Sequence, residues 1–251
     1  MQKYTIKEIS FLLKNNSVSP ETLDFLKKDE RIGVNKLLQA YYTRLKKDEA
    51  ERARLFKMTK YERQLREEGF SVIAGIDEAG RGPLAGPVVA SAVILPVDVQ
   101  FEGLNDSKKM SPQKRDLLFE KIEKEAVDLG IGIISAEEID RINVHKASLN
   151  AMKMALESMY LDADYLLVDG FAIPGLDVPQ KALPKGDALS LSIAAASVVA
   201  KVTRDRIMLK MHHEYPEYGF DRHKGYGTAI HMDAIERCGL SPEHRRSFCS
   251  E

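Results

Sequence analysis

The segment from Ala188 to Met211 is apolar on nearly every side when it is drawn as a helix. Such a helix has no polar face to present to water, so it has to lie between other layers of the fold. Short β-branched runs supply the strands of such a layer, at residues 72–76, 88–95, 130–134 and 165–168. Strands that come first and then alternate with helices predict an α/β domain with a mixed sheet covered on both faces.

The charges divide the chain into two unlike parts. The whole chain has 37 Lys and Arg against 38 Asp and Glu, but residues 1–70 alone carry 16 against 11. In this first part Ser19-Pro20-Glu21 is typical of a helix start, and apolar residues recur at helical spacing from about Val34 to Gly69. We expect two or three helices over residues 1–70, the last one long, and the α/β domain with C-terminal helices over residues 71–251.

Several classes of protein are excluded by composition. No apolar run approaches the roughly 18 residues of a membrane-spanning helix, so we expect no signal peptide and no membrane span. The two cysteines, Cys238 and Cys249, are too few for a disulfide framework, and we expect a cytoplasmic protein. The net charge of −1 by itself argues against a nucleic-acid partner, but the basic first 70 residues weaken that argument.

A glycine-rich loop follows the first predicted strand. Its Gly80-x-Gly82-x-x-Ala85 has the form of a dinucleotide-binding loop, which would make the protein an oxidoreductase. That loop requires a helix directly after it, whereas here Pro83 and Pro87 precede a β-branched run. We therefore predict a hairpin connection and no nucleotide cofactor.

Two interpretations of this loop remain open. Gly80 and Gly82 lack side chains that would keep a sugar or phosphate from the backbone, and Arg81 between them adds a fixed positive charge. The alternative is a tight turn whose glycines only supply positive φ angles.

Acidic residues stand at the ends of core elements. Asp77 and Glu78 end the first strand, Asp169 follows the run at 165–168, and Asp187 precedes the apolar helix. Each has a structural alternative when taken singly: Asp169-Gly170 suits a turn and Asp187 suits a helix N-cap. Together, they would form a set of oxygen donors of the kind that Mg²⁺ or Mn²⁺ prefers.

Four carboxylates in one place repel one another unless a cation lies between them. Two divalent ions about 4 Å apart can activate a water and stabilise the leaving oxygen of a phosphodiester. The predicted reaction is therefore phosphoryl hydrolysis with Mg²⁺ or Mn²⁺, and we expect two ions.

Five ordered motifs resemble bacterial ribonuclease HII. They comprise Asp-Glu-Ala-Gly-Arg-Gly-Pro-Leu-Ala-Gly-Pro and four further stretches, at residues 77–87, 105–111, 166–170, 186–205 and 218–228. The resemblance implies a ribonuclease H-like fold and an endonuclease that cuts the RNA strand of an RNA–DNA hybrid. It also implies cleavage 5′ to a single ribonucleotide in duplex DNA, with 5′-phosphate and 3′-hydroxyl ends, in RNA primer removal and ribonucleotide excision repair.

The resemblance also assigns roles to residues. Asp77, Glu78, Asp169 and Asp187 match the metal-binding acids, and Gly80, Arg81 and Gly82 match the loop that reads the 2′-hydroxyl, the group that distinguishes RNA from DNA. Tyr226 matches the aromatic residue that stacks on the following deoxyribose; without the resemblance it is one more half-buried loop tyrosine. Phosphate contacts are expected at Lys108, Lys201 and Arg204, for which a solvated face is the alternative.

The motifs do not reach residues 1–70. The sister family, ribonuclease HIII, has an N-terminal β-containing platform and lacks the full Gly-Arg-Gly, so ribonuclease HII is the better match. The basic segment would hold nucleic acid by electrostatics or brace the catalytic domain. A catalytically silent hybrid-binding protein is the remaining alternative, which the presence of all the acids disfavours. We expect a monomer and assign no metal to the histidines.

Overall fold

The structure is a computed structural model that describes residues 4–249 apart from 100, 106, 108 and 109. The chain forms two compact units, residues 1–54 and 55–251. The division falls inside helix α3 (Ile32–Met58), earlier in the chain than the boundary expected at residue 70. Helix α4 (Lys60–Glu67) therefore belongs to the second unit.

The first unit is helical, as its apolar spacing predicts. Helix α1 (Ile6–Lys14) begins with a capping box between Thr5 and Glu8, and α2 (Pro20–Lys27) begins after Ser19 as expected. Apolar side chains from these helices and from the start of α3 form its core: Ile9, Leu13, Leu26, Val34 and Leu38. The stretch predicted as one long helix is broken at Thr59 into α3 and α4.

The described residues of the second unit form a five-stranded mixed sheet of order β3-β2-β1-β4-β5. Its strands are β1 (Ile73–Ala79), β2 (Val88–Ile94), β3 (Asp128–Ile134), β4 (Tyr165–Asp169) and β5 (Gln180–Leu183). The first three pair antiparallel, while β4 lies parallel to both β1 and β5. The expected mixed sheet is present, and β2 directly follows the glycine-rich loop, which is thus a hairpin connection.

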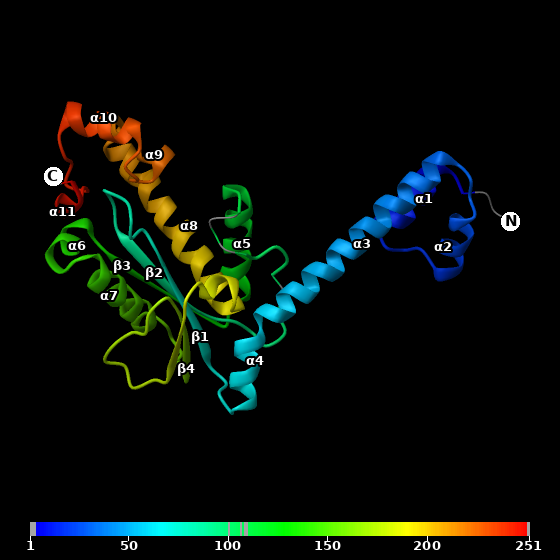
Figure 1. Ribbon diagram of the computed structural model, residues 1–251, viewed down its shortest axis with the longest axis horizontal. Helices are drawn as coiled ribbons and strands as arrows, with labels where there is room; N and C mark the ends of the chain where they lie inside the picture. Colours follow the sequence, from blue (N-terminus) through cyan, green and yellow to red (C-terminus); the bar gives the residue numbers. More distant parts are fainter. Residues whose placement is uncertain (1–3, 100, 106, 108–109, 250–251) are drawn as a thin grey trace. The chain divides into compact units, whose positions relative to one another are not determined.

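Helices cover both faces of this sheet (Figure 1). Helices α5 (Pro112–Glu125) and α8 (Leu191–Glu214) pack on one face, and α6 (Ala136–Ile142) and α7 (Val144–Glu157) pack on the other. Helix α8 is buried along most of its length, as its all-round apolar sequence predicts. It approaches β1 so closely that a Cβ atom at Gly75 would collide with the backbone of Ser192.

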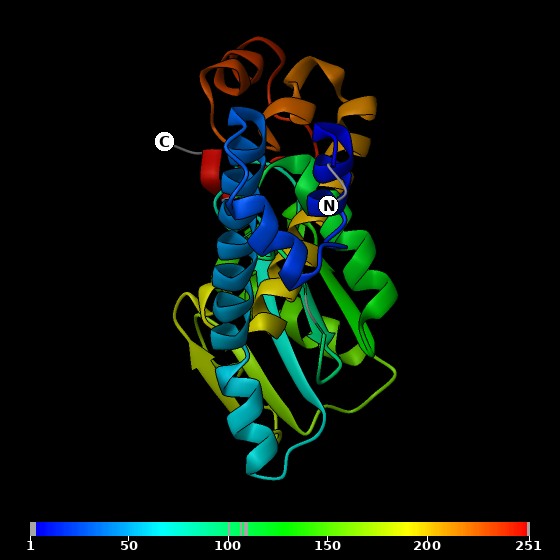
Figure 2. The ribbon, with the colours of Figure 1, turned by 90° about the vertical axis from the view of Figure 1, so that its right-hand side faces the viewer.

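Short C-terminal helices gather at one end of the sheet, as both ribbon views show (Figures 1 and 2). They are α9 (Phe220–His223), α10 (Ala229–Cys238) and α11 (Arg246–Cys249). Tyr218, Phe220 and Ala234 pack on Met208 of α8 and on Ala85 of the glycine-rich loop. This packing brings the C-terminal segment to the end of β1 where Asp77 and Glu78 lie.

Two details differ from the sequence interpretation. Strand β5 was not expected, because Gln180-Lys181-Ala182-Leu183 has no β-branched residue and is only partly buried at the sheet edge. Helix α8 begins after Ser190, whose hydroxyl accepts a hydrogen bond from Ile193 N–H. Asp187 is therefore not the N-cap of this helix, and that structural alternative is wrong.

In the described part of the chain, no helix combines the length and the apolar character needed to span a membrane.

Candidate active site

One cavity of about 450 Å³ brings the four acids together: Asp77, Glu78, Asp169 and Asp187 all line it. Strands β1 and β4 are parallel neighbours in which Ile76 pairs with Val168. Asp77 and Asp169, the next residues along each strand, therefore lie at the same edge of the sheet. Asp187 reaches the cavity from η2 (Gly186–Ala188), the short 3₁₀ turn before α8.

Asp77 is buried beside other acidic residues of this cavity. Its side chain is only 6% exposed, and burial raises the pKa of Asp77 well above its usual value, with the charges of Glu78 and Asp169 acting in the same direction. Burial also raises the pKa of Glu78, although Arg81 opposes the shift across an Nη1 to Oε1 distance of 3.3 Å. The ionised form of these carboxyl groups is thus destabilised unless a cation approaches.

These donors fit a divalent cation by type and location. Carboxylate oxygens are the ligands that Mg²⁺ and Mn²⁺ prefer, and a nearby positive ion removes the penalty for ionising Asp77. Among the described residues, no three acidic, histidine or cysteine side chains already enclose a site for an ion. The cavity therefore offers the oxygens of four separate carboxylates rather than a closed coordination shell.

Asp169 also fixes the turn that carries Asp187. Its Oδ1 atom accepts a hydrogen bond of 2.6 Å from the Gly186 N–H. The end of β4 is thereby tied to η2, so two acids that are distant in sequence are held at one place.

The Gly-Arg-Gly loop forms part of the same cavity wall. Gly80 has a φ angle of 98°, and a Cβ atom there would collide with the Arg204 side chain. A Cβ atom at Gly82 would lie 3.7 Å from the Tyr226 ring, an ordinary contact. Gly80 is thus required by the packing of Arg204 behind the loop, whereas Gly82 leaves open space on the cavity side.

Tyr226 faces the cavity from the loop after α9 and is 45% exposed. Its carbonyl group accepts a hydrogen bond from the His231 Nδ1 atom at 3.0 Å. His231 Nε2 lies 3.0 Å from His244 Nε2, and Ser241 donates to His244 Nδ1 from its N–H and from its hydroxyl group. These buried rings support the Tyr226 loop.

The contacts define the tautomers of both rings. A carbonyl group only accepts, so His231 donates from Nδ1, and its Nε2 atom must accept from the Nε2–H group of His244. A proton added to either ring would place two N–H groups against each other. Burial accordingly lowers the pKa of His231 and, together with the charge of His231, lowers the pKa of His244 to about 4.

We expect acid to destabilise the protein through these histidines. Because the folded pKa of His244 lies below the unfolded value, the unfolded state binds more protons as the pH falls from about 6.5 towards about 4. The free energy of unfolding should therefore fall by about 1–2 kcal/mol from pH 7 to pH 5. Urea unfolding at both pH values measures it.

The variant His244→Gln serves as the control, because it lacks a ring that can titrate. Its free energy of unfolding should depend less on pH, whatever its value at pH 7. An equal pH dependence in the variant and the original protein would contradict the assignment.

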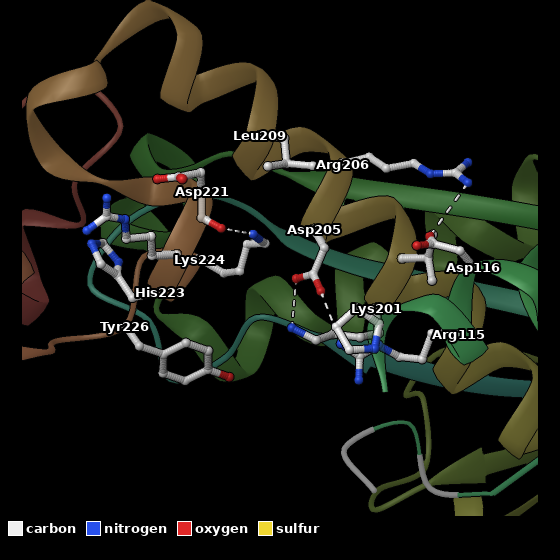
Figure 3. Close-up of a pocket in the computed structure, with 13 residues that line it drawn as sticks. Arg115, Asp116, Lys201, Asp205, Arg206, Leu209, Asp221, His223, Lys224 and Tyr226 are labelled. Carbon is white, nitrogen blue, oxygen red and sulfur yellow. Dashed lines mark hydrogen bonds and ion pairs between the residues drawn. The ribbon is translucent and has the colours of Figure 1, made fainter. Parts of the chain in front are cut away.

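A second cavity of about 500 Å³ adjoins the first. Arg115, Lys201 and Tyr226 line both cavities. Figure 3 shows that Asp205 forms ion pairs with two of these residues. Its Oδ1 atom lies 2.7 Å from Lys201 Nζ, and its Oδ2 atom lies 3.9 Å from Arg115 Nη2. Lys201, one of the expected phosphate contacts, thus lines both cavities and pairs with Asp205. Arg115 of helix α5 carried no sequence signal.

The two other expected phosphate contacts have different outcomes. Arg204 is only 1% exposed, and its guanidinium group donates to the carbonyl groups of Pro87, Lys224 and Ala85. A phosphate cannot reach it, so this expectation is corrected: Arg204 joins two loops from behind. Lys108 lies outside the described residues, although the neighbouring Ser107 lines the acidic cavity.

Glu62 of helix α4 was missed by the sequence interpretation. It is 5% exposed, and its Oε1 atom accepts hydrogen bonds from Ser190 Oγ, Ser192 N and Ser192 Oγ at 2.6, 3.0 and 2.7 Å. A carboxylate at the start of α8 also interacts favourably with the helix dipole. One glutamate among the many charges of residues 1–70 gives no sign of this distant contact.

We expect Glu62→Ala to lower the free energy of unfolding by about 3 kcal/mol, because it leaves buried donors at the start of α8 without an acceptor. Glu67→Ala, at an exposed position of the same helix, should change it by less than about 0.5 kcal/mol. Chemical denaturation of both variants measures the difference. Equal stability of the two variants would rule out the proposed capping.

Comparison with known proteins identifies both parts of the chain. Residues 74–251 match the family model described as Ribonuclease HII, and residues 5–66 match that described as Ribonuclease HII N-terminal domain. The chain is 48% identical over 249 residues to the ribonuclease HII of Bacillus cereus strain G9842, covering 99% of this chain and 96% of that one. It is 50% identical over 248 residues to that of Geobacillus kaustophilus strain HTA426, covering 99% and 95%.

A solved structure supports the same fold. The ribonuclease H2 from Pyrococcus horikoshii OT3 superimposes with a TM-score of 0.61 and 28% sequence identity, covering 70% of this chain and 93% of that chain. The expected α/β fold, a ribonuclease H-like mixed sheet flanked by helices with a helical N-terminal segment, is thereby confirmed.

Proposed function

Because the chain belongs to the ribonuclease HII family of metal-dependent nucleases of the ribonuclease H type, we propose that it hydrolyses the RNA strand of RNA–DNA hybrids. We further propose that it cuts 5′ to a single ribonucleotide embedded in duplex DNA and leaves 5′-phosphate and 3′-hydroxyl ends. RNA primer removal and ribonucleotide excision repair are the cellular processes that this activity would serve.

One observation carries the proposal: a single cavity is lined by all four acids, by the Gly-Arg-Gly loop and by Tyr226. The acids supply the chemistry of phosphodiester hydrolysis. The loop and the tyrosine supply recognition groups beside them, which a general phosphodiesterase would not need.

Asp77, Glu78, Asp169 and Asp187 would hold the metal, for which we propose two Mn²⁺ or Mg²⁺ ions. When bound, such ions activate a water molecule and stabilise the leaving oxygen of the phosphodiester. Burial of Asp77 limits the access of bulk water to its own carboxylate. The hydrogen bond from Gly186 N–H to Asp169 holds the carboxylate on the cavity wall.

The remaining residues bind and select the substrate. Lys201 and Arg115 lie between the two cavities, where their charges would neutralise phosphates of a bound strand. The N–H groups of the Gly80–Gly82 loop would meet the 2′-hydroxyl group. The exposed ring of Tyr226 beside Gly82 would stack on the next deoxyribose.

Residues 1–70 have two proposed roles. A hollow on the first unit is lined by Lys36, Arg44 and Lys47, which favours a contact with nucleic acid through its phosphates. In the second unit, Leu65 of α4 packs with Leu167 and Leu183 of the sheet, which favours a bracing role for the later part of this segment. We propose that the protein acts as a cytoplasmic monomer.

The decisive test compares three duplexes: pure DNA, an RNA–DNA hybrid, and DNA with one ribonucleotide. Each is incubated with Mg²⁺, with Mn²⁺ and with a chelator. Cleavage of the two ribonucleotide-containing duplexes, with metal only, is the expected result. Cleavage of pure DNA, or cleavage in chelator, would contradict the proposal.

A further inference from the structure

A second buried arginine, Arg245, lies behind the Gly-Arg-Gly loop. It is 0% exposed, and its guanidinium group donates to three carbonyl groups of the loop. Nη2 lies 2.6 Å from Gly80 O, Nη1 lies 3.0 Å from Arg81 O, and Nε and Nη2 lie 2.9 and 2.7 Å from Gly86 O. One side chain thus holds both ends of the loop.

The backbone around Arg245 is fastened to the same loop. Arg245 N–H donates to Leu84 O at 2.8 Å, and Gly86 N–H donates to Glu243 O at 2.8 Å. On the other side, the Asp140 carboxylate of α6 accepts hydrogen bonds from Arg246 N at 2.7 Å and from Ser247 N at 3.1 Å. We call residues 243–247 the C-terminal clasp.

The contacts of Arg245 show which way the N–H groups of the loop point. In a trans peptide the carbonyl group of one residue and the N–H group of the next point in opposite directions. The carbonyl groups of Gly80 and Arg81 point towards Arg245, so the N–H groups of Arg81 and Gly82 point away from it. Residues 80–82 line the cavity that contains the acids, and successive N–H groups of this kind bind oxygen atoms.

Two buried guanidinium groups stand together behind this loop. Arg204 lies near enough to Arg245 for its charge to help lower the Arg245 pKa, which burial reduces to about 9. Burying two like charges costs free energy that apolar side chains would not cost. Both guanidinium groups are nevertheless hydrogen-bonded to backbone carbonyl groups. Arg245 binds those of Gly80, Arg81 and Gly86, and Arg204 binds those of Ala85, Pro87 and Lys224.

We propose that Arg245 is a positioning residue for ribonucleotide selection. By binding the carbonyl groups of Gly80 and Arg81, it directs the N–H groups of Arg81 and Gly82 towards the sugar hydroxyl group of a bound ribonucleotide. This inference rests on the proposed function, because it requires the loop to read that hydroxyl group.

Arg245→Lys tests the proposal, because lysine keeps the charge but cannot bridge three carbonyl groups. Arg246→Lys makes the same change at the exposed neighbouring position and is the matched control. Binding to all-DNA duplex and to duplex with one ribonucleotide is measured with Ca²⁺ in place of Mg²⁺. The preference for the ribonucleotide is the ratio of the two affinities. Arg245→Lys should lower this ratio by about tenfold, because the loss of one hydrogen bond corresponds to about that factor.

Two further readouts separate positioning from a general structural role. The affinity of Arg245→Lys for all-DNA duplex should equal that of the original protein. Mn²⁺ should also raise the melting temperature of the variant by as much as it raises that of the original protein. An unchanged preference for the ribonucleotide would overturn the proposal. It would also be overturned by equal loss of affinity for both duplexes, or by loss of the Mn²⁺ effect.

Asp140→Ala provides a second test that leaves Arg245 in place and decides the matter if Arg245→Lys does not fold. It releases the far side of the clasp and should reduce the same preference by a smaller factor; an unchanged preference would overturn the proposal. Failure of the original protein to prefer or cut ribonucleotide-containing duplex would instead contradict the proposed function.

Discussion

Asp77→Asn should abolish cleavage while leaving the folded protein at least as stable as before. The change removes the charge of a carboxylate that we propose binds the metal. Such a charge contributes several kcal/mol to stabilising the transition state, so a loss of about 1,000-fold or more is expected. The change also removes a buried carboxyl group whose pKa is raised by burial and by the charges of Glu78 and Asp169. Asparagine keeps the Oδ1 acceptor that binds Glu78 N–H at 2.7 Å.

Cleavage of hybrid and thermal unfolding in chelator together test this expectation. Asp177→Asn, at an exposed position, is the control and should leave cleavage unchanged. Addition of Mn²⁺ should raise the melting temperature of the control much more than that of Asp77→Asn. Cleavage by Asp77→Asn near the original rate would show that the metal assignment is wrong.

Tyr226→Ala should reduce incision at a lone ribonucleotide by about 10-fold to 100-fold. We take its stacking on the deoxyribose to be comparable with base–aromatic stacking, which contributes about 1–3 kcal/mol. The ring is 45% exposed, so its removal should change the free energy of unfolding much less. Incision rates and urea unfolding of the same preparations measure both effects.

Tyr226→Phe is the matched control, since it keeps the ring and removes only the hydroxyl group. It should cut at close to the original rate. If Tyr226→Ala lost stability and incision to the same degree, the tyrosine would be a packing residue and the stacking role would be excluded.

Much of the fold was predictable because its signals are local. The β-branched runs match strands β1 to β4, and the apolar segment after Asp187 matches the buried helix α8. Strand β5 was not predictable, since it forms only because β4 offers it a hydrogen-bonding edge. The break at Thr59 was also missed, because one threonine lowers helix propensity too little to predict a helix end.

The candidate site was predictable where residue type and strand position agree. Asp77 and Asp169 follow strands that lie parallel in the sheet, so their meeting at one edge follows from the α/β pattern. Arg204 was misjudged because helical position alone does not tell whether a cation faces solvent or a buried carbonyl group. Its three carbonyl partners come from two loops that are distant in sequence.

The sequence by itself determined strands β1 to β4, the buried helix α8, the acids at strand ends and the family of the chain, because these depend on local periodicity and on motifs. Only the tertiary structure decided which charged residues support the site. Glu62 caps α8 and Arg245 holds the Gly-Arg-Gly loop through contacts between distant segments. A buried charge is tolerated only where such partners converge, and that convergence exists only in the folded chain.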